Sequence, residues 1–158
     1  MVEMVQSEAN TEFTVEGRRV IVVGAARSGL AAAELLAARG ADVVVTDICT
    51  TVNQDLGRWS KRVTFELGEH RNQMFLGADL VVLSPGVSPE QSAVRTARES
   101  GIPVIGELEL ASRWLRGRVV AVTGTKGKST TSLLAGRILD AAGFSTLVGG
   151  NVGPALSA

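Results

Sequence analysis

One glycine-rich turn in this chain has the residues needed to bind a nucleoside triphosphate. The sequence TGTKGKST spans residues 123–130, after an apolar run and before a helix-forming segment. In such a turn, backbone N–H groups surround phosphate oxygens, a lysine reaches the β- and γ-phosphates, and a hydroxyl ligates Mg²⁺. Lys128 is therefore the predicted catalytic residue and Ser129 the predicted metal ligand. The predicted ATP site comprises Gly124, Thr125, Lys126, Gly127, Lys128, Ser129 and Thr130.

The turn at residues 123–130, which is the second glycine-rich turn along the chain, is a shortened form of the general phosphate-binding loop. The general pattern has a glycine five positions before Gly127, where this chain has Val122. The alternative interpretation is a capped helix that simply follows a strand. Packing gives no reason for a lysine between a glycine and two hydroxyl residues, so we favour the phosphate site.

An earlier turn, GAARSG at residues 24–29, resembles a dinucleotide-binding fingerprint. Gly24 and Gly29 match the first and third glycines of that pattern, whereas Ala26 replaces the middle one. Backbone N–H groups and the helix N-terminus after this turn would attract a diphosphate. Asp47, near the end of the next predicted strand, could accept a hydrogen bond from a ribose hydroxyl or a base N–H. The alternatives are a tight turn without a ligand, a solvated Arg27, and an Asp47 that only caps a turn.

Both turns require strands and helices to position them, and the sequence predicts an alternation of the two. The predicted strands are Arg19–Val23, Asp42–Thr46, Val63–Leu67, Ala78–Leu83, Ile102–Ile105, Arg118–Val122 and Phe144–Val148. The predicted helices are Leu30–Arg39, Pro89–Ser100, Glu107–Leu115 and Lys128–Ala142. This order indicates an α/β fold with a Rossmann-like parallel sheet, followed by the first βαβ unit of a P-loop ATP-binding domain.

The pattern divides the chain into three parts. Residues 1–16 are polar and are predicted to be a disordered or frayed N-terminus. Residues 17–116 are predicted to form the Rossmann-like domain. Residues 117–158 restart the alternation and are predicted to be the incomplete start of the P-loop domain, because one such unit is too small to bury a core of its own.

Composition excludes several classes of function. The chain has 16 basic and 16 acidic residues and 4% aromatic residues, so neither a basic surface nor a base-stacking platform for nucleic acid is expected. No signal peptide or membrane-spanning run is predicted, and the single cysteine, Cys49, fits a reducing cytoplasm. We expect His70 to lie in a surface loop, and Trp59 and Trp114 to be packing residues.

The short motifs together resemble those of the Mur ligases, which build the peptide stem of bacterial cell-wall precursors. The similarity rests on GTKGKST at 124–130, GAARSG at 24–29, LSPGV at 83–87, GELEL at 106–110 and GGNVG at 149–153. It extends from about Gly17 to the last residue. The combination is most similar to the family member that adds D-glutamate.

The resemblance implies a substrate, UDP-N-acetylmuramoyl-L-alanine, together with ATP, Mg²⁺ and D-glutamate. It also implies that the first turn holds the diphosphate, Asp47 the uracil edge, and Asn151 the diphosphate–sugar region. The implied UDP-substrate residues are Gly24, Arg27, Ser28, Gly29, Asp47, Ser84, Pro85, Gly86 and Asn151. The family reaction phosphorylates the alanyl carboxylate, and the amine of D-glutamate then attacks the acyl phosphate.

The chain departs from the family pattern in two respects. Ile48 and Cys49 follow Asp47 where members often have a polar and then a basic residue, so the resemblance does not extend to the basic residue's contact with uracil. The family's further metal ligands and D-glutamate domain would lie beyond Ala158, so the 158 residues alone are expected to be inactive. Two alternatives remain: an NAD-binding or regulatory Rossmann module, which the first turn alone permits, and a generic P-loop NTPase.

Overall fold

The computed structural model describes residues 2–7, 13–52, 59–150 and 153–158, and its largest unit is a five-stranded sheet. The strands are β2 (Arg19–Val23), β3 (Asp42–Asp47), β4 (Val63–Leu67), β5 (Leu80–Leu83) and β6 (Val104–Gly106). All four strand pairings are parallel, which confirms the predicted Rossmann-like α/β fold. β-branched runs such as RVIVV and DVVVTD suit strands buried on both faces.

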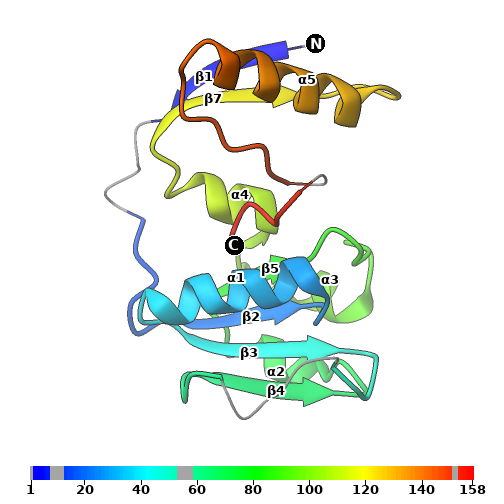
Figure 1. Cartoon of the computed structure of the whole chain (residues 1–158). Helices are drawn as coiled ribbons and strands as arrows, with labels where there is room; N and C mark the ends of the chain where they lie inside the picture. Colours follow the sequence, from blue (N-terminus) through cyan, green and yellow to red (C-terminus); the bar gives the residue numbers. More distant parts are fainter. Residues whose placement is uncertain (1, 8–12, 53–58, 151–152) are drawn as a thin grey trace.

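The strand order β4-β3-β2-β5-β6 places the first strand of the sheet at its centre. The chain runs outward through β3 and β4 on one side, then crosses back to β5 and β6 on the other (Figure 1). The topological switch point therefore lies between β2 and β5. In open parallel sheets, ligands bind outside the carboxyl ends of the strands at such a point.

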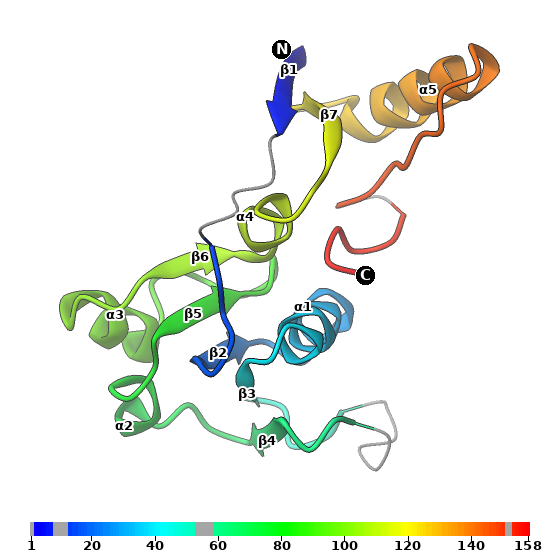
Figure 2. The same cartoon turned by 90° about the vertical axis from the view of Figure 1, so that its left-hand side faces the viewer.

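Helices cover both faces of the sheet and form two apolar cores. One core packs α1 (Arg27–Ala38) and α4 (Glu107–Ser112) on one face, through residues such as Leu36 and Leu110. The other packs α2 (Asn72–Phe75) and α3 (Ser92–Glu99) on the opposite face, through Phe75 and Ala97. Figure 2 shows these two layers on either side of the strands. The covered sheet gives the loops at its carboxyl edge a fixed support.

A second, two-stranded sheet pairs β7 (Gly117–Val122) with β1 (Val2–Ser7) in antiparallel orientation. The prediction of a frayed terminus was therefore wrong for residues 2–7, because the unpaired backbone groups of an edge strand are satisfied by pairing with this distant segment. Helix α5 (Lys128–Ala141) follows β7. Its Leu133, Leu134 and Ile138 are 46, 57 and 60% exposed, so this unit buries little of its apolar surface.

The predicted strand Phe144–Val148 is also wrong, since these residues form no regular element. A strand needs a partner for its N–H and C=O groups, and among the described residues this segment pairs with no strand; Val148 packs against α5 at Gly136 instead. The short helix α2 was not predicted; it buries Met74 and Phe75 within a mainly polar stretch. The other predicted elements all occur: the strands Arg19–Val23 and Val63–Leu67 have the predicted ends, and no end of the others is shifted by more than three residues.

Both tryptophans pack as predicted. Trp59 meets Phe65 edge to face, with ring centroids 5.3 Å apart. Trp114 lies 5.2 Å from the Phe13 ring, and the Arg39 guanidinium lies 4.2 Å from its centroid. Among the described residues, no helix combines the length and the apolarity needed to cross a membrane.

Candidate functional site

Three predicted ligand-binding segments meet at the carboxyl edge of the five-stranded sheet. They are the turn after β2, the end of β3, and the Ser84-Pro85-Gly86 turn after β5. The Gly24 N–H donates to the Thr46 carbonyl at 2.8 Å, and the Ser84 hydroxyl donates to the Gly24 carbonyl at 3.1 Å. These bonds tie the three segments into one rigid rim at the topological switch point.

Gly24 and Gly29 make this close approach possible. Gly24 has a φ of 100°, which favours glycine, and a Cβ there would lie 2.9 Å from Ser84 and Val87 atoms. A Cβ at Gly29 would overlap the Gly24 carbonyl and the Ser84 hydroxyl. Packing in this fold thus requires glycine at both positions, whether or not either glycine also contacts a phosphate.

The first turn presents the start of helix α1 to solvent. Ala26 is its N-cap residue and has no side chain that could cap the helix, while Ala26 and Arg27 are exposed and Ser28 is half-buried. The first amides of a helix lack intrahelical acceptors, and the helix dipole favours an anion beside them. Arg27 and Ser28 thus begin the helix at this end, and their contact with a diphosphate stays a prediction.

Asp47 uses both of its carboxylate oxygens within the protein. Oδ2 accepts from the Ala25 N–H at 2.6 Å, and Oδ1 accepts from the Cys49 N–H at 2.9 Å. Burial by itself raises the pKa of Asp47, but these backbone hydrogen bonds outweigh burial and hold the pKa below its ordinary value of 3.8. The carboxylate thus fastens the first turn to the end of β3, a role that the prediction of uracil contact did not include.

His70 lies beside this carboxylate in a loop, as expected, but it is half-buried there. Its Nδ1 is 2.9 Å from the hydroxyl of the fully buried Thr46, and its ring meets Phe75 edge to face. Burial lowers the pKa of His70, and the nearby Asp47 opposes that shift only in part. No feature of the sequence around His70 signalled this position.

The Ser84-Pro85-Gly86 turn divides into an inner and an outer part. Ser84 is 5% exposed, with its hydroxyl bonded to Gly24, so it joins the two turns. Pro85 and Gly86 are exposed, and no atom lies within 4 Å of a Cβ built on Gly86. Of these three predicted ligand residues, Pro85 and Gly86 are the ones that a ligand can reach directly.

The second glycine-rich turn lies apart from this rim, between β7 and α5. Gly127 has a φ of 79° and is the N-cap residue of α5, and Lys128 donates from Nζ to the Gly124 carbonyl at 2.5 Å. The predicted ATP-site residues 124–130 are all exposed. A left-handed glycine before a helix that begins with Lys-Ser-Thr suits a triphosphate in its donor chemistry.

The second turn supplies few ligands for a metal ion. Ser129 supplies one hydroxyl in the first turn of α5. Within the part of the chain that the structure describes, no three His, Cys, Asp or Glu residues gather to hold a metal ion. A Mg²⁺ ion at this turn would therefore take its remaining ligands from phosphate oxygens, from water, or from protein groups that do not form such a cluster. Asn151, the last predicted ligand residue, lies outside the described residues.

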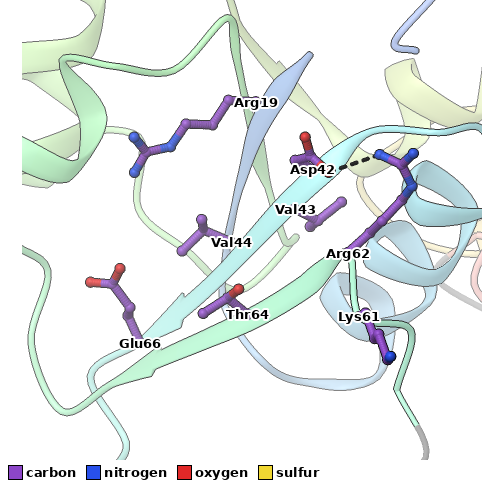
Figure 3. A pocket seen from close by; sticks show the side chains of 8 residues that line it. All are labelled: Arg19, Asp42, Val43, Val44, Lys61, Arg62, Thr64 and Glu66. Carbon is purple, nitrogen blue, oxygen red and sulfur yellow. Dashed lines mark hydrogen bonds and ion pairs between the residues drawn. The ribbon is translucent and has the colours of Figure 1, made fainter. Parts of the chain in front are cut away.

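A shallow hollow of about 390 Å³ lies away from this rim, along β3 and β4 (Figure 3). Arg19, Asp42 and Arg62 line it near the amino ends of the strands, and Arg62 pairs with Asp42 at 2.9 Å. Ligands of parallel sheets bind at the opposite, carboxyl edge. We therefore assign the candidate site to the rim and not to this hollow.

Sequence reasoning also missed Glu107, which is 2% exposed at the start of α4. A signal for it was present, because Glu107 shares a helical face with Leu110 and Ala111, three and four residues later. Both of these residues are buried, and so the pattern placed a carboxylate on the inner face of the helix.

Comparison with known proteins agrees with this arrangement. Curated relatives named UDP-N-acetylmuramoylalanine–D-glutamate ligase, from Koribacter versatilis and Desulfosudis oleivorans, are 47 and 45% identical over 147 and 149 residues. These alignments cover 90 and 89% of this chain but only 32 and 31% of the relatives. The chain thus spans about a third of the length of the curated relatives it matches.

A solved structure of a pseudomurein peptide ligase type C from Methanothermus fervidus shares the fold. It superposes with a TM-score of 0.54 at 20% identity, over 80% of this chain and 27% of that one. Residues 18–106 match the model of the Mur ligase MurD-like N-terminal domain. This match covers more than half of the chain, which therefore belongs to the MurD-like Mur ligase family.

Proposed function

We propose that this chain binds the UDP part of UDP-N-acetylmuramoyl-L-alanine as part of an ATP-dependent ligase that adds D-glutamate. The single observation that carries the proposal is the rim, where the turns after β2 and β5 and the end of β3 are joined at the switch point. Family membership and the names of the relatives support the choice of substrate.

In this proposal the diphosphate lies at the N-terminus of α1. Arg27 and Ser28 face it there, and the exposed Pro85 and Gly86 form the opposite side. Asp47 keeps the first turn in place and retains lone pairs for the uracil edge, because each carboxylate oxygen can accept more than one hydrogen bond. Asn151 is proposed for the diphosphate–sugar region.

The second turn is proposed to bind ATP. Lys128 and the amides around Gly127 would hold the phosphates, and Ser129 would ligate Mg²⁺. A bound Mg²⁺ ion supplies positive charge that stabilises the transferring phosphoryl group. Lys128 adds charge at the same place, which offsets the repulsion between the alanyl carboxylate and the γ-phosphate before the amide bond to D-glutamate forms.

An NAD-binding Rossmann module is the second candidate, favoured by the dinucleotide-like turn and the acidic residue at the end of β3. Ala26 argues against it, because its exposed Cβ stands where dinucleotide folds use glycine for close approach of the pyrophosphate. The second turn argues against it as well, since a nicotinamide domain does not use Gly-Lys-Ser-Thr.

Titration calorimetry with UDP-N-acetylmuramoyl-L-alanine and with NAD⁺ tests the proposal. We expect the UDP-sugar to bind more tightly, and Arg27→Gln to weaken its binding. Arg18→Gln is the matched control, because Arg18 is exposed next to the amino end of β2, at the opposite edge of the sheet. Tighter binding of NAD⁺, or equal effects of the two substitutions, would overturn the proposal.

A further inference from the structure

Glu107 is the only charged side chain that is buried within the described ranges of the chain. It is the first residue of α4 and follows β6 directly, so it stands at the same carboxyl edge as the candidate site. Burial of a carboxylate is unfavourable unless hydrogen bonds replace its lost hydration. The fold therefore requires specific partners for this group.

Ser157 supplies those partners from a position 50 residues further along the chain. Glu107 Oε1 accepts from the Ser157 N–H at 2.8 Å and from the Ser157 hydroxyl at 2.5 Å. Ser157 is itself 6% exposed and the neighbouring Ala155 is 4% exposed. Hydrogen bonds to a charged acceptor that is shielded from water are among the stronger ones in proteins.

The contact holds the segment that follows α5 on the surface of α4. The Gly150 N–H donates to the Pro154 carbonyl at 3.1 Å, and a Cβ on Gly150 would lie 3.3 Å from Leu108 of α4. Figures 1 and 2 both show this red C-terminal segment beside α4 and facing α1. The β7–α5 unit is thus attached at both ends of α4, by the chain after Ser112 and by the Glu107–Ser157 contact.

We infer that Glu107 is a positioning residue, a latch that holds residues 148–150 and 153–158 on the Rossmann unit, and that these residues form a second wall of the substrate site. This inference rests on the proposed function, in which Asn151 is proposed to contact the diphosphate–sugar region of the substrate. The rim holds the nucleotide end without the latch. Loss of the latch is therefore expected to affect the two ends of the substrate differently.

Hydrogen–deuterium exchange tests the latch without any ligand. In Glu107→Ala, we expect amides of residues 148–158 to exchange about tenfold faster, as loss of hydrogen bonds to a charged group implies. Exchange in β2 and β5 should stay unchanged. Glu109→Ala is the matched control, because Glu109 lies on the same helix, half-exposed, in a surface ion pair with Arg113. Wild-type exchange of residues 148–158 in Glu107→Ala would overturn the inference.

Calorimetry then tests the consequence for the ligand. We expect Glu107→Ala to weaken UDP-N-acetylmuramoyl-L-alanine about tenfold while UMP binds as before. Glu107→Gln should restore most of the affinity, because its amide oxygen can accept both bonds from Ser157. Equal losses for the two ligands would overturn the latch as a positioning device.

Two further outcomes separate this inference from the proposed function. If the wild-type chain binds neither nucleotide, the proposed function fails, and the exchange experiment alone decides whether the latch exists. If Glu107→Ala does not fold, Ser157→Ala takes its place, since it removes only the hydroxyl and leaves the N–H on the carboxylate. Unchanged exchange of residues 148–158 in Ser157→Ala would then count against the latch.

Discussion

The Asp47 carboxylate accepts a hydrogen bond from the Ala25 N–H at 2.6 Å and thereby joins the end of β3 to the turn after β2. Its other oxygen accepts from the Cys49 N–H at 2.9 Å. A side chain that satisfies donors on two loops shapes the site even before it touches a ligand. Stability and affinity are therefore coupled at this position.

Asp47→Asn should lower the free energy of unfolding by about 1–3 kcal/mol, because asparagine has one acceptor oxygen and turns an NH₂ group toward a backbone donor. Urea unfolding followed by circular dichroism measures the change. The affinity for UDP should fall as well, by about 1.5–3 kcal/mol if the carboxylate also accepts a hydrogen bond from the ligand. Asp42→Asn serves as control, since the Asp42 side chain forms an exposed ion pair with Arg62. Unchanged stability would show that the Asp47 bonds do not fasten the loops.

The free energy of unfolding should fall in two steps as the pH decreases. The folded-state pKa of His70 lies below 6.5, so the unfolded chain binds more protons just below that pH and stability is lost there. The folded-state pKa of Asp47 lies below 3.8, so its contribution is present above 3.8 and is lost as the pH falls below that value. Denaturant titrations between pH 8 and pH 3 would reveal both windows.

Single substitutions test which residue causes each of the two steps in the free energy of unfolding. His70→Asn keeps a polar group near Thr46 and should remove the step below pH 6.5, while Asp47→Asn should reduce the step below pH 3.8. A His70→Asn profile that matches the wild-type profile would contradict the assignment to His70.

Gly29→Ala should destabilise the fold by about 3 kcal/mol, near the upper end for an overpacked site. The added methyl group would overlap the Gly24 carbonyl, which is backbone and cannot move aside cheaply. Gly86→Ala is the matched substitution in the same rim, because its Cβ meets no atom within 4 Å and its φ is not positive. Thermal unfolding of the two variants gives the comparison, and equal melting temperatures would refute the packing role of Gly29.

The Gly86→Ala variant also distinguishes an effect on folding from an effect on ligand binding. It should unfold like the wild type, yet it should weaken UDP-N-acetylmuramoyl-L-alanine if the substrate passes close to this exposed backbone. Calorimetry on the folded variant measures the effect. A wild-type affinity would remove Gly86 from the proposed contact surface.

The polypeptide of 158 residues should release no phosphate with UDP-N-acetylmuramoyl-L-alanine, D-glutamate, ATP and Mg²⁺. Phosphoryl transfer needs groups that fix the metal and position the acceptor, beyond one lysine and one hydroxyl. The Lys128 turn is also exposed, and the described residues around it form a sheet of two strands, which limits its rigidity. A phosphate-release assay decides, and substrate-dependent release that is lost in Lys128→Ala would contradict this expectation.

The sequence by itself determined the strands and the turns of the Rossmann unit. β-branched runs, glycine stops and alternating periodicity are local signals, and parallel strands must bring their carboxyl ends to one edge. For this reason the turn at Gly24, the end of β3 at Asp47 and the turn at Ser84 could be expected to meet.

Only the tertiary structure decided which strands pair and which polar groups hydrogen-bond to one another. The pairing of β1 with β7, the bonds of Asp47 to Ala25 and Cys49, the half-buried place of His70, and the Glu107–Ser157 contact were not predicted from the sequence. Apart from the Asp47–Cys49 bond, each joins residues that are far apart in the chain. Such contacts depend on which donors and acceptors the folded chain shields from water, and a local pattern carries little of that information. The same reason explains why the segment Phe144–Val148 does not form a strand.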